Sequence, residues 1–373
     1  MLVYVIILMI PLCWYLLPDQ SKNTNNFLLA FSLFTLLVIS SLRDGQMGTD
    51  YHGYLNYFES ISRTGDAFFN EKGYVWFNYL LSRISTDNVV LALGVNLLLF
   101  IPLYCHIRNN TEDKYWALCV LIFVANPYMY VQTTFNILRQ CCATGFVLIA
   151  ANFFKKKRLT SSIIGMLFIV AAMQFHRSVV LVFLFFLPFL FPLKWSAARW
   201  RLVFFVCLGI NLSGGVEFIC QALASEFSYG GYANYEASLL DNPAYLLLCL
   251  IFFWWMTRIY DRLDDSTKGD FFVNIFMLCM CVLPLAVKND MIYRLRIYLT
   301  YVSLPGLVKI ICAADQLDFW DSEKEDRGIK YSAGNLLKKM YVAYFVCFFI
   351  AYFTYFYLRN NIHYVPFKFT EFY

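Results

Sequence analysis

The apolar segment FLLAFSLFTLLVISSL, residues 27–42, runs directly into the polar segment RDGQMGTDY, residues 43–51. A helix needs roughly 20 apolar residues to cross the hydrocarbon core of a membrane, and fewer when its ends snorkel. The first segment is therefore expected to be a membrane span that ends at Leu42. The second segment opens with Arg43 and brings a guanidinium, carboxylates and an adaptable glycine-containing backbone to the bilayer surface. We expect a functional site at this junction.

The composition indicates an integral membrane protein. Of the 373 residues, 60% are hydrophobic and only 15% are charged, whereas soluble chains carry closer to a quarter charged residues. The apolar runs predict an all-α polytopic fold of about 12 spans, within a range of about 10–13. The predicted spans are approximately 2–17, 27–42, 89–107, 115–134, 137–154, 160–175, 178–193, 202–222, 243–259, 271–287, 297–313 and 340–358. A kinked helix is expected at Pro127 or Pro305.

Polar segments punctuate what we interpret as a single membrane domain, residues 1–373. The largest is 43–88, which contains a possible amphipathic helix. A second loop, 224–242, lies on the same side, and a mixed-charge connector, 314–339, lies on the opposite side. Placing 43–88 outside puts most of the 30 Lys and Arg residues in the inner loops, as the topology rule for membrane proteins requires.

Several functional classes find no support in the sequence. The net charge of +5 comes mostly from short inner loops such as Lys155–Arg158, which are typical orientation signals and do not imply a nucleic-acid partner. The twelve Cys residues lie in or beside apolar runs and lack metal-ligand spacing. No Asp-x-Asp pair, Walker loop or dinucleotide fingerprint occurs. We therefore expect no metal and no cofactor, with energy supplied by the substrate or a gradient.

Four arginines lie near the predicted outer interface: Arg43, Arg139, Arg294 and Arg296. A guanidinium donates two parallel hydrogen bonds to phosphate oxygens and keeps its charge, so it suits a lipid-linked pyrophosphate. Arg294 and Arg296 would diverge by about 200° on a helix, so both could face one ligand only from an extended backbone. The alternative is local pairing, because Asp290 lies four residues before Arg294 and Asp44 adjoins Arg43.

Three side chains could accept a proton. His176 lies in a turn between two predicted spans, and imidazole is well matched to proton transfer near neutrality, although a single His at a helix end also serves as a cap. Asp50 and Glu71 are the competing carboxylates. Aromatic residues are dense in the outer segments, notably at Tyr229, Tyr232 and Tyr235. They form either an interfacial aromatic belt or a surface that stacks on sugars.

Four blocks of this sequence resemble the EpsG family of Wzy-like bacterial polysaccharide polymerases. They are Arg43 with Gly48-Thr49-Asp50-Tyr51, then Glu71-Lys72-Gly73-Tyr74, then Asn136-Ile137-Leu138-Arg139-Gln140, and finally Phe175-His176-Arg177-Ser178. They cover about the first half of the chain, and the second half matches more loosely through its spans and the segment with Arg294. Lys72 and Arg177 depart from residues that are common in the family.

The resemblance implies a multi-pass enzyme of the bacterial inner membrane with a site that faces the periplasm. Such an enzyme joins undecaprenyl-pyrophosphate-linked oligosaccharide units into O-antigen, capsule or exopolysaccharide, moving the growing chain onto the non-reducing-end hydroxyl of a new unit without a metal. The implied partners are this lipid-linked oligosaccharide, membrane lipids and a chain-length regulator.

The same resemblance suggests roles for individual residues. The pyrophosphate would be bound by Arg43, Arg139, Arg294 and Arg296, with Arg139 also in the catalytic set beside the rival proton acceptors Asp50 and His176. The glycan would be bound by Thr49, Tyr51, Glu71, Gln140, Tyr229, Tyr232 and Tyr235.

Two alternatives remain open at the level of sequence. A single-sugar glycosyltransferase or a ligase acting on lipid-linked sugars would use the same groups. A transporter or flippase for a lipid-linked glycan belongs to another class, but transporters tend to show paired halves and charges at the membrane midplane. Here the four candidate arginines gather at the outer face and the central parts of the spans are nearly free of charge, which favours the polymerase.

Overall fold

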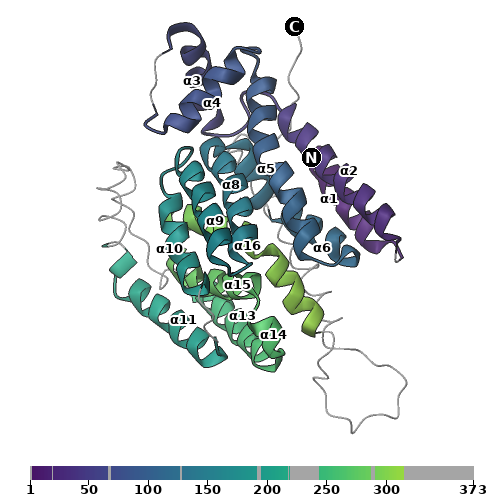
Figure 1. Cartoon of the computed structure of the whole chain (residues 1–373), viewed down its shortest axis with the longest axis vertical. Helices are drawn as coiled ribbons and strands as arrows, with labels where there is room; N and C mark the ends of the chain where they lie inside the picture. Colours follow the sequence, from purple (N-terminus) through teal and green to yellow (C-terminus); the bar gives the residue numbers. More distant parts are fainter. Residues whose placement is uncertain are drawn as a thin grey trace. The chain divides into compact units, whose positions relative to one another are not determined.

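The computed structural model describes residues 2–314, apart from 19, 66–68, 127, 191–194, 217, 219–242 and 287–289. All elements assigned in this part of the chain are helices (Figure 1), so the predicted all-α class is confirmed for it. The chain packs as two compact units. Unit 1 holds the described residues up to Phe153 and Ile163–Arg177, and unit 2 holds Phe154–Ser162 and the described residues from Ser178 onward.

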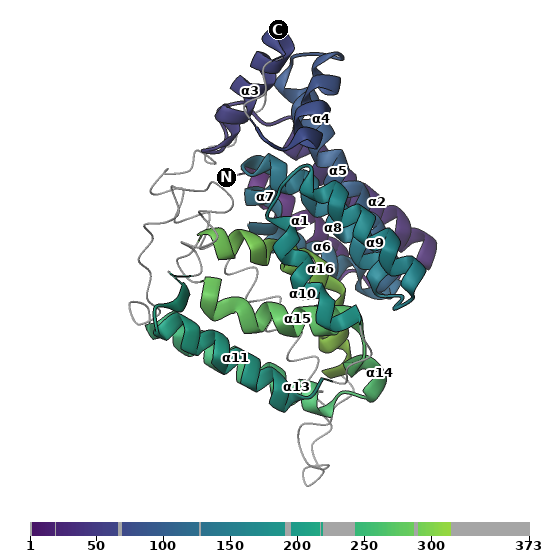
Figure 2. The same ribbon diagram turned by 60° about the vertical axis from the view of Figure 1, so that its left-hand side comes forward.

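Unit 1 carries most of the predicted site. Helix α2 packs along α5, α1 packs along α6, and α3 and α4 pair beside the first turns of α5 (Figure 2). Ser21 caps α2 and Asp87 caps α5 by accepting backbone N–H bonds, which fixes where these two apolar helices begin. The elements are α1 (Leu2–Leu16), α2 (Lys22–Ser41), α3 (Tyr51–Thr64), α4 (Lys72–Ser82), α5 (Asn88–Asn110), η1 (Asp113–Tyr115), α6 (Trp116–Ala125), η2 (Tyr128–Gln132), α7 (Thr133–Phe135) and most of α8 (Leu138–Phe154) and α9 (Leu159–Met173).

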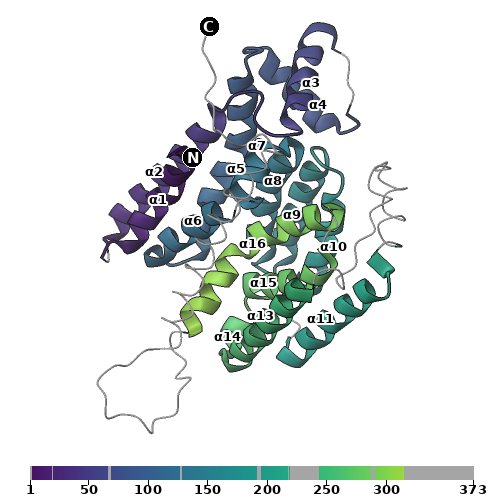
Figure 3. The ribbon, with the colours of Figure 1, turned by 180° about the vertical axis from the view of Figure 1, so that it is seen from behind.

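Unit 2 is centred on two helices that lie side by side, α15 and α16 (Figure 3). A Cβ on Gly306 of α16 would come 2.1 Å from the carbonyl oxygen of Phe272 in α15, so the glycine permits this close approach. The elements are α10 (Val179–Leu190), α11 (Ala197–Leu212), α13 (Pro243–Arg262), α14 (Asp265–Lys268), α15 (Phe271–Val282), η5 (Leu283–Ala286) and α16 (Asp290–Ala314).

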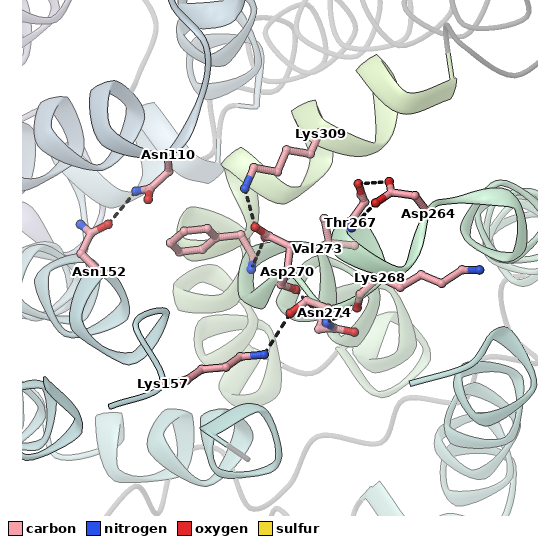
Figure 4. A network of polar contacts seen from close by, with 12 residues as sticks. Asn110, Asn152, Lys157, Asp264, Thr267, Lys268, Asp270, Val273, Asn274 and Lys309 are labelled. Carbon is pink, nitrogen blue, oxygen red and sulfur yellow. Dashed lines mark hydrogen bonds and ion pairs between the residues drawn. The ribbon is translucent and has the colours of Figure 1, made fainter. Parts of the chain in front are cut away.

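A polar network caps α15 in unit 2 (Figure 4). Asp270 accepts hydrogen bonds from the backbone N–H groups of Phe272 and Val273, at 2.8 and 3.1 Å, and forms an ion pair with Lys309 of α16. The ammonium group of Lys157 donates to the carbonyl of Gly269 at 3.0 Å. One lysine of the basic run interpreted as an orientation signal therefore also ties its turn to the start of α15.

The predicted spans can be compared with the lengths of the helices. Within the described part of the chain, three segments are long and apolar enough to cross a membrane, namely α2, α5 and Arg294–Ala313 of α16. The two bent segments Asp113–Ala125 and Tyr128–Phe135 count as a fourth if together they form one broken span. Shorter apolar helices occupy other predicted span positions: α1, α8, α9, α10 and Phe271–Ala286. The total of about 12 stays a prediction, since the span at 340–358, loop 224–242 and connector 315–339 lie outside the described residues.

The predicted span at 115–134 is broken. Helix α6 ends at Ala125, and the two halves are bent by 69°. Asn126 accepts the backbone N–H of Tyr128 at 3.1 Å through its side-chain oxygen, which starts the π-helical turn η2. The Tyr130 hydroxyl then donates to the Leu36 carbonyl of α2 at 2.8 Å. A break near Pro127 was expected, because proline lacks the amide hydrogen that a continuous helix uses. After this break the chain continues through η2 and α7 to Asn136.

A close approach between α5 and α8 leads to a prediction about folding. A Cβ on Gly145 would lie 1.8 Å from the carbonyl oxygen of Leu98, and a backbone carbonyl cannot move aside as a side chain can. We expect Gly145→Ala to destabilise the protein by about 1–3 kcal/mol or more, with a lower yield and a lower thermal midpoint in detergent. Gly53→Ala is the matched control, because nothing lies within 4 Å of a Cβ there. Equal stability of the two variants would contradict the packing described.

Candidate functional site

Asn136 joins two parts of unit 1 that are far apart in the sequence. Its side-chain oxygen accepts the backbone N–H of Asp50 at 2.7 Å and the hydroxyl of Thr49 at 3.2 Å. The Thr49 hydroxyl also lies 3.3 Å from a carboxylate oxygen of Asp50. Since Asn136 lies two residues before α8, this amide positions the polar loop that precedes α3 against the start of the helix that carries Arg139.

Arg43 is fully buried beside the same junction. Its guanidinium carbon lies 3.9 Å from the ring centroid of Tyr51 and 5.1 Å from that of Phe135. One guanidinium nitrogen donates to the carbonyl of Ser40. Cation–π contacts of this kind stabilise a guanidinium that has lost water. The aromatic rings and the end of α2 thus fix both the position and the charge of Arg43.

Arg139 forms the second cationic position. Its Nη1 lies 3.0 Å from Oε2 of Glu71, which is the residue directly before α4, and both side chains are largely buried. Its guanidinium carbon also lies 4.3 Å from the ring centroid of Phe69. Because Arg139 is in the first turn of α8, the third sequence block contacts the first block through Asn136 and the second block through Glu71.

An aromatic cluster borders the Arg139–Glu71 pair. The ring of Phe69 lies 4.6, 5.6 and 5.9 Å from the rings of Tyr57, Tyr74 and Tyr54, centroid to centroid. Burial raises the pKa of Tyr57 to about 12, with Arg139 lowering the pKa and Glu71 raising it. The Tyr57 hydroxyl therefore keeps its proton over the physiological range, and the cluster adds no negative charge beside Arg139.

The fourth block packs against the second. The backbone N–H of Tyr74 in α4 donates to the carbonyl of Gln174 at 3.1 Å, and the Arg177 side chain donates to the carbonyl of Asn70 at 3.5 Å. His176 lies in this turn and is buried. Contacts thus run from the first block to the third, from the third to the second, and from the second to Gln174, the residue directly before the fourth.

The residues expected to bind glycan include several that are buried in the structure. Tyr51 is fully buried, with its ring against Arg43 and its hydroxyl donating to the carbonyl of Asn88 at 3.3 Å. Gln140 is also buried in the first turn of α8. In this structure Tyr51 and Glu71 directly position Arg43 and Arg139. Their contact with glycan remains a prediction, and Tyr229, Tyr232 and Tyr235 lie outside the described residues.

Arg294 and Arg296 belong to unit 2 and are partly buried. The sequence predicted a loop up to residue 296 and a span from 297, but α16 begins at Asp290, so both arginines are helical. That boundary was wrong because the charged residues interrupt the apolar run without breaking the helix. Two helical residues that are two apart point about 200° away from each other, so the structure favours one of them, and not both, as a contact for any single ligand.

Asn136 and Phe69 had no assigned role in the sequence interpretation. Asn136 could have been found, because it is a polar residue between two apolar runs and lies three positions before Arg139. Phe69 carried no such signal. Among the described side chains, no group of three or more His, Cys, Asp or Glu is placed to hold a metal ion.

Comparison with known proteins identifies the relationship. The model of the EpsG family, which is a family of Wzy-like polymerases, matches residues 26–316. No curated protein and no solved structure gives a significant match. The matched region contains all four blocks and most of the described chain. The chain belongs to the EpsG family.

Proposed function

We propose that this protein is a membrane polysaccharide polymerase that joins oligosaccharide units carried on undecaprenyl pyrophosphate. It would act at the outer face of the bacterial inner membrane, making O-antigen, capsule or exopolysaccharide. Family membership supports the polymerase class. The lipid-linked substrate is the one that the family resemblance implies. The residue roles rest on the way in which Asn136, Arg139 and Glu71 bring the separate sequence blocks together.

The proposed step exchanges one glycosidic bond for another. The bond between the reducing-end sugar carbon of the growing chain and its pyrophosphate breaks, and the same carbon bonds to a non-reducing-end hydroxyl oxygen of the incoming unit. The lipid pyrophosphate leaves with the electron pair of the broken bond, and the hydroxyl proton passes to a protein carboxylate. A good leaving group is already present, so the protein has to stabilise developing phosphate charge and accept a proton.

Arg139 is the residue best placed to meet the pyrophosphate. Its guanidinium already holds an anion, the Glu71 carboxylate, at 3.0 Å in a largely buried setting. A phosphate oxygen can take the same donor because a carboxylate and a phosphate accept from guanidinium in similar geometry. Arg43, fixed at the same junction, supplies a second positive charge. That Arg294 and Arg296 assist at the pyrophosphate stays a prediction.

Asp50 is the preferred proton acceptor. Its backbone N–H is held by Asn136, three residues before Arg139, so the carboxylate belongs to the same loop-and-helix junction as the proposed pyrophosphate site. His176 lies in the turn whose Gln174 carbonyl accepts the backbone N–H of Tyr74 in α4. It is assigned the smaller role of holding α4 and Glu71 in place.

The test is polymerisation by the purified protein. Protein in nanodiscs is given one defined lipid-pyrophosphate-linked repeat unit, and the products are separated by size. A ladder of multiples of the unit supports the proposal. A single added sugar, or use of a nucleotide sugar instead, would contradict it, and transfer of finished chains to a different acceptor would indicate a ligase.

Metal removal gives a further prediction for the same assay. We expect the ladder to keep its intensity within about twofold when a chelator is added, because guanidinium groups and not a divalent cation stabilise the leaving pyrophosphate. Titration back with magnesium is the control. Loss of the ladder in chelator with recovery on adding magnesium would contradict the arginine-based mechanism.

A further inference from the structure

Helix α4 has two different faces. On one face Tyr74 and Asn78 are buried. Phe77 and Leu81 lie over Gly94 of α5, where an added Cβ would come 3.3 Å from Phe77 and 2.6 Å from Leu81. This face explains how α4 is attached to the rest of unit 1.

The other face of α4 is apolar and exposed. Trp76, Tyr79 and Leu80, together with Ile84 in the turn that follows the helix, have exposed fractions of 65%, 38%, 42% and 75%. Tyr79 and Leu80 follow Trp76 by three and four positions, which places these three residues along one side of the helix. Single exposed apolar residues are ordinary in proteins, but a continuous stripe of large ones indicates a surface that something apolar covers.

Helix α3 is the neighbour of α4 (Figure 1). The outer face of α3 has the opposite character. Its exposed positions include His52, Asn56, Glu59 and Arg63, and the last two form an exposed ion pair at 3.6 Å. This face is suited to water. Two helices that pack together in one polar segment therefore present outer surfaces of opposite character, so the apolar stripe is specific to α4.

The position of α4 identifies what covers the stripe. Helix α5 is long and apolar enough to span a membrane, and its Leu93, Leu97 and Ile101 are exposed, as the lipid-facing side of a span would be. Helix α4 packs at Gly94, near the start of α5, and hence near the depth at which this span meets water. The membrane lipid that surrounds α5 is therefore the apolar partner that α4 can also contact.

Arg83 fits the same environment. Its guanidinium carbon lies 4.6 Å from the ring centroid of Tyr79, and the guanidinium donates to the Tyr79 hydroxyl. An arginine folded over a tyrosine has an apolar body and a polar tip, and such side chains extend from hydrocarbon toward the headgroups at a membrane surface.

We propose that α4 is an interfacial helix whose stripe of Trp76, Tyr79, Leu80 and Ile84 lies in the acyl-chain region of the bilayer, while the exposed face of α3 lies in water. The partner is bulk membrane lipid. Because Glu71 lies directly before α4 and pairs with Arg139, this anchorage holds the pair at headgroup depth. The assignment does not depend on the reaction that the protein catalyses.

Photolabelling of the full-length protein in vesicles tests this assignment. The vesicles contain a phosphatidylglycerol with a diazirine in its acyl chain, and labelled peptides are mapped by mass spectrometry. We expect label on residues 76–84 at a level close to that on residues 93–101 of α5, with residues 52–63 of α3 at background. Background label on α4 with normal label on α5 would overturn the proposal, because the stripe would then face water or another protein.

A variant and a competitor complete the experiment. Trp76→Ser combined with Leu80→Ser and Ile84→Ser is expected to reduce the α4 label while the α5 label stays unchanged, and an unchanged α4 label would overturn the proposal. A polyprenyl diphosphate added at equimolar amount to the protein is expected to leave the α4 label in place. Displacement by this lipid would identify a ligand site and overturn the assignment to bulk lipid.

Discussion

Replacing Arg139 by Lys is expected to lower polymer formation by roughly 10²–10³-fold while the protein remains folded. Lysine keeps the positive charge and can still pair with Glu71, but it cannot offer two parallel donors to a phosphate. Chain transfer depends on charge stabilisation as the pyrophosphate leaves, so the larger loss is expected in kcat, with a smaller loss of affinity for the pyrophosphate group. The measurement is the rate of ladder formation by purified protein, with the thermal midpoint recorded beside it.

Arg63→Lys is the matched control for Arg139→Lys. Both arginines pair with a glutamate in unit 1, but the Arg63–Glu59 pair is exposed, with side-chain exposures of 77% and 56%, against 18% and 6% for the Arg139–Glu71 pair. An exposed pair contributes little to stability, so Arg63→Lys should keep full activity. If Arg139→Lys were as active as Arg63→Lys, the role of Arg139 at the pyrophosphate would be refuted.

Asp50→Asn is expected to reduce kcat by about 10²–10⁴-fold with little change in KM, because the amide cannot accept the hydroxyl proton. Asparagine has the same shape and keeps the backbone N–H that donates to Asn136, so the loop should hold its conformation. Single-turnover rates with a defined lipid-linked unit separate the chemical step from binding.

The comparison with His176→Gln decides between the two proton acceptors. We expect His176→Gln to be several-fold to about tenfold less active than wild type, because His176 is proposed to hold α4 and not to take the proton. Its remaining activity should be far higher than that of Asp50→Asn. Asn56→Ala, an exposed change on α3, controls for unspecific effects. A larger loss of kcat in His176→Gln than in Asp50→Asn would reverse the assignment.

Helices fixed by local chemistry could be predicted from the sequence. Apolar runs located α5 well, because its cap Asp87 lies directly before the apolar run. They located the end of α2, but α2 begins at Lys22 and not at residue 27, because its cap Ser21 lies before several polar residues. The break after Ala125 was anticipated from Pro127. The start of α16 was not, since Asp290 and Arg294 interrupt the apolar pattern without interrupting the helix.

The candidate site could be predicted only in part. Arg43, Arg139 and Asp50 were identified from residue type and span position. Their connections were not, because the bond from Asp50 to Asn136 and the ion pair from Glu71 to Arg139 join residues that are 86 and 68 positions apart. The burial of Arg43 against Tyr51 also depends on tertiary packing, and it converts an expected surface donor into a fixed internal charge.

Binding of a stable pyrophosphate analogue measures the central claim directly. The ligand is a polyprenyl methylenediphosphonate, which cannot be consumed, and its affinity is measured for wild type, Arg43→Gln, Arg139→Lys and Arg63→Lys in nanodiscs. We expect at least tenfold weaker binding for both site variants and unchanged binding for Arg63→Lys. Equal affinity of all four proteins would contradict the claim that the charges of Arg43 and Arg139 together stabilise the departing pyrophosphate.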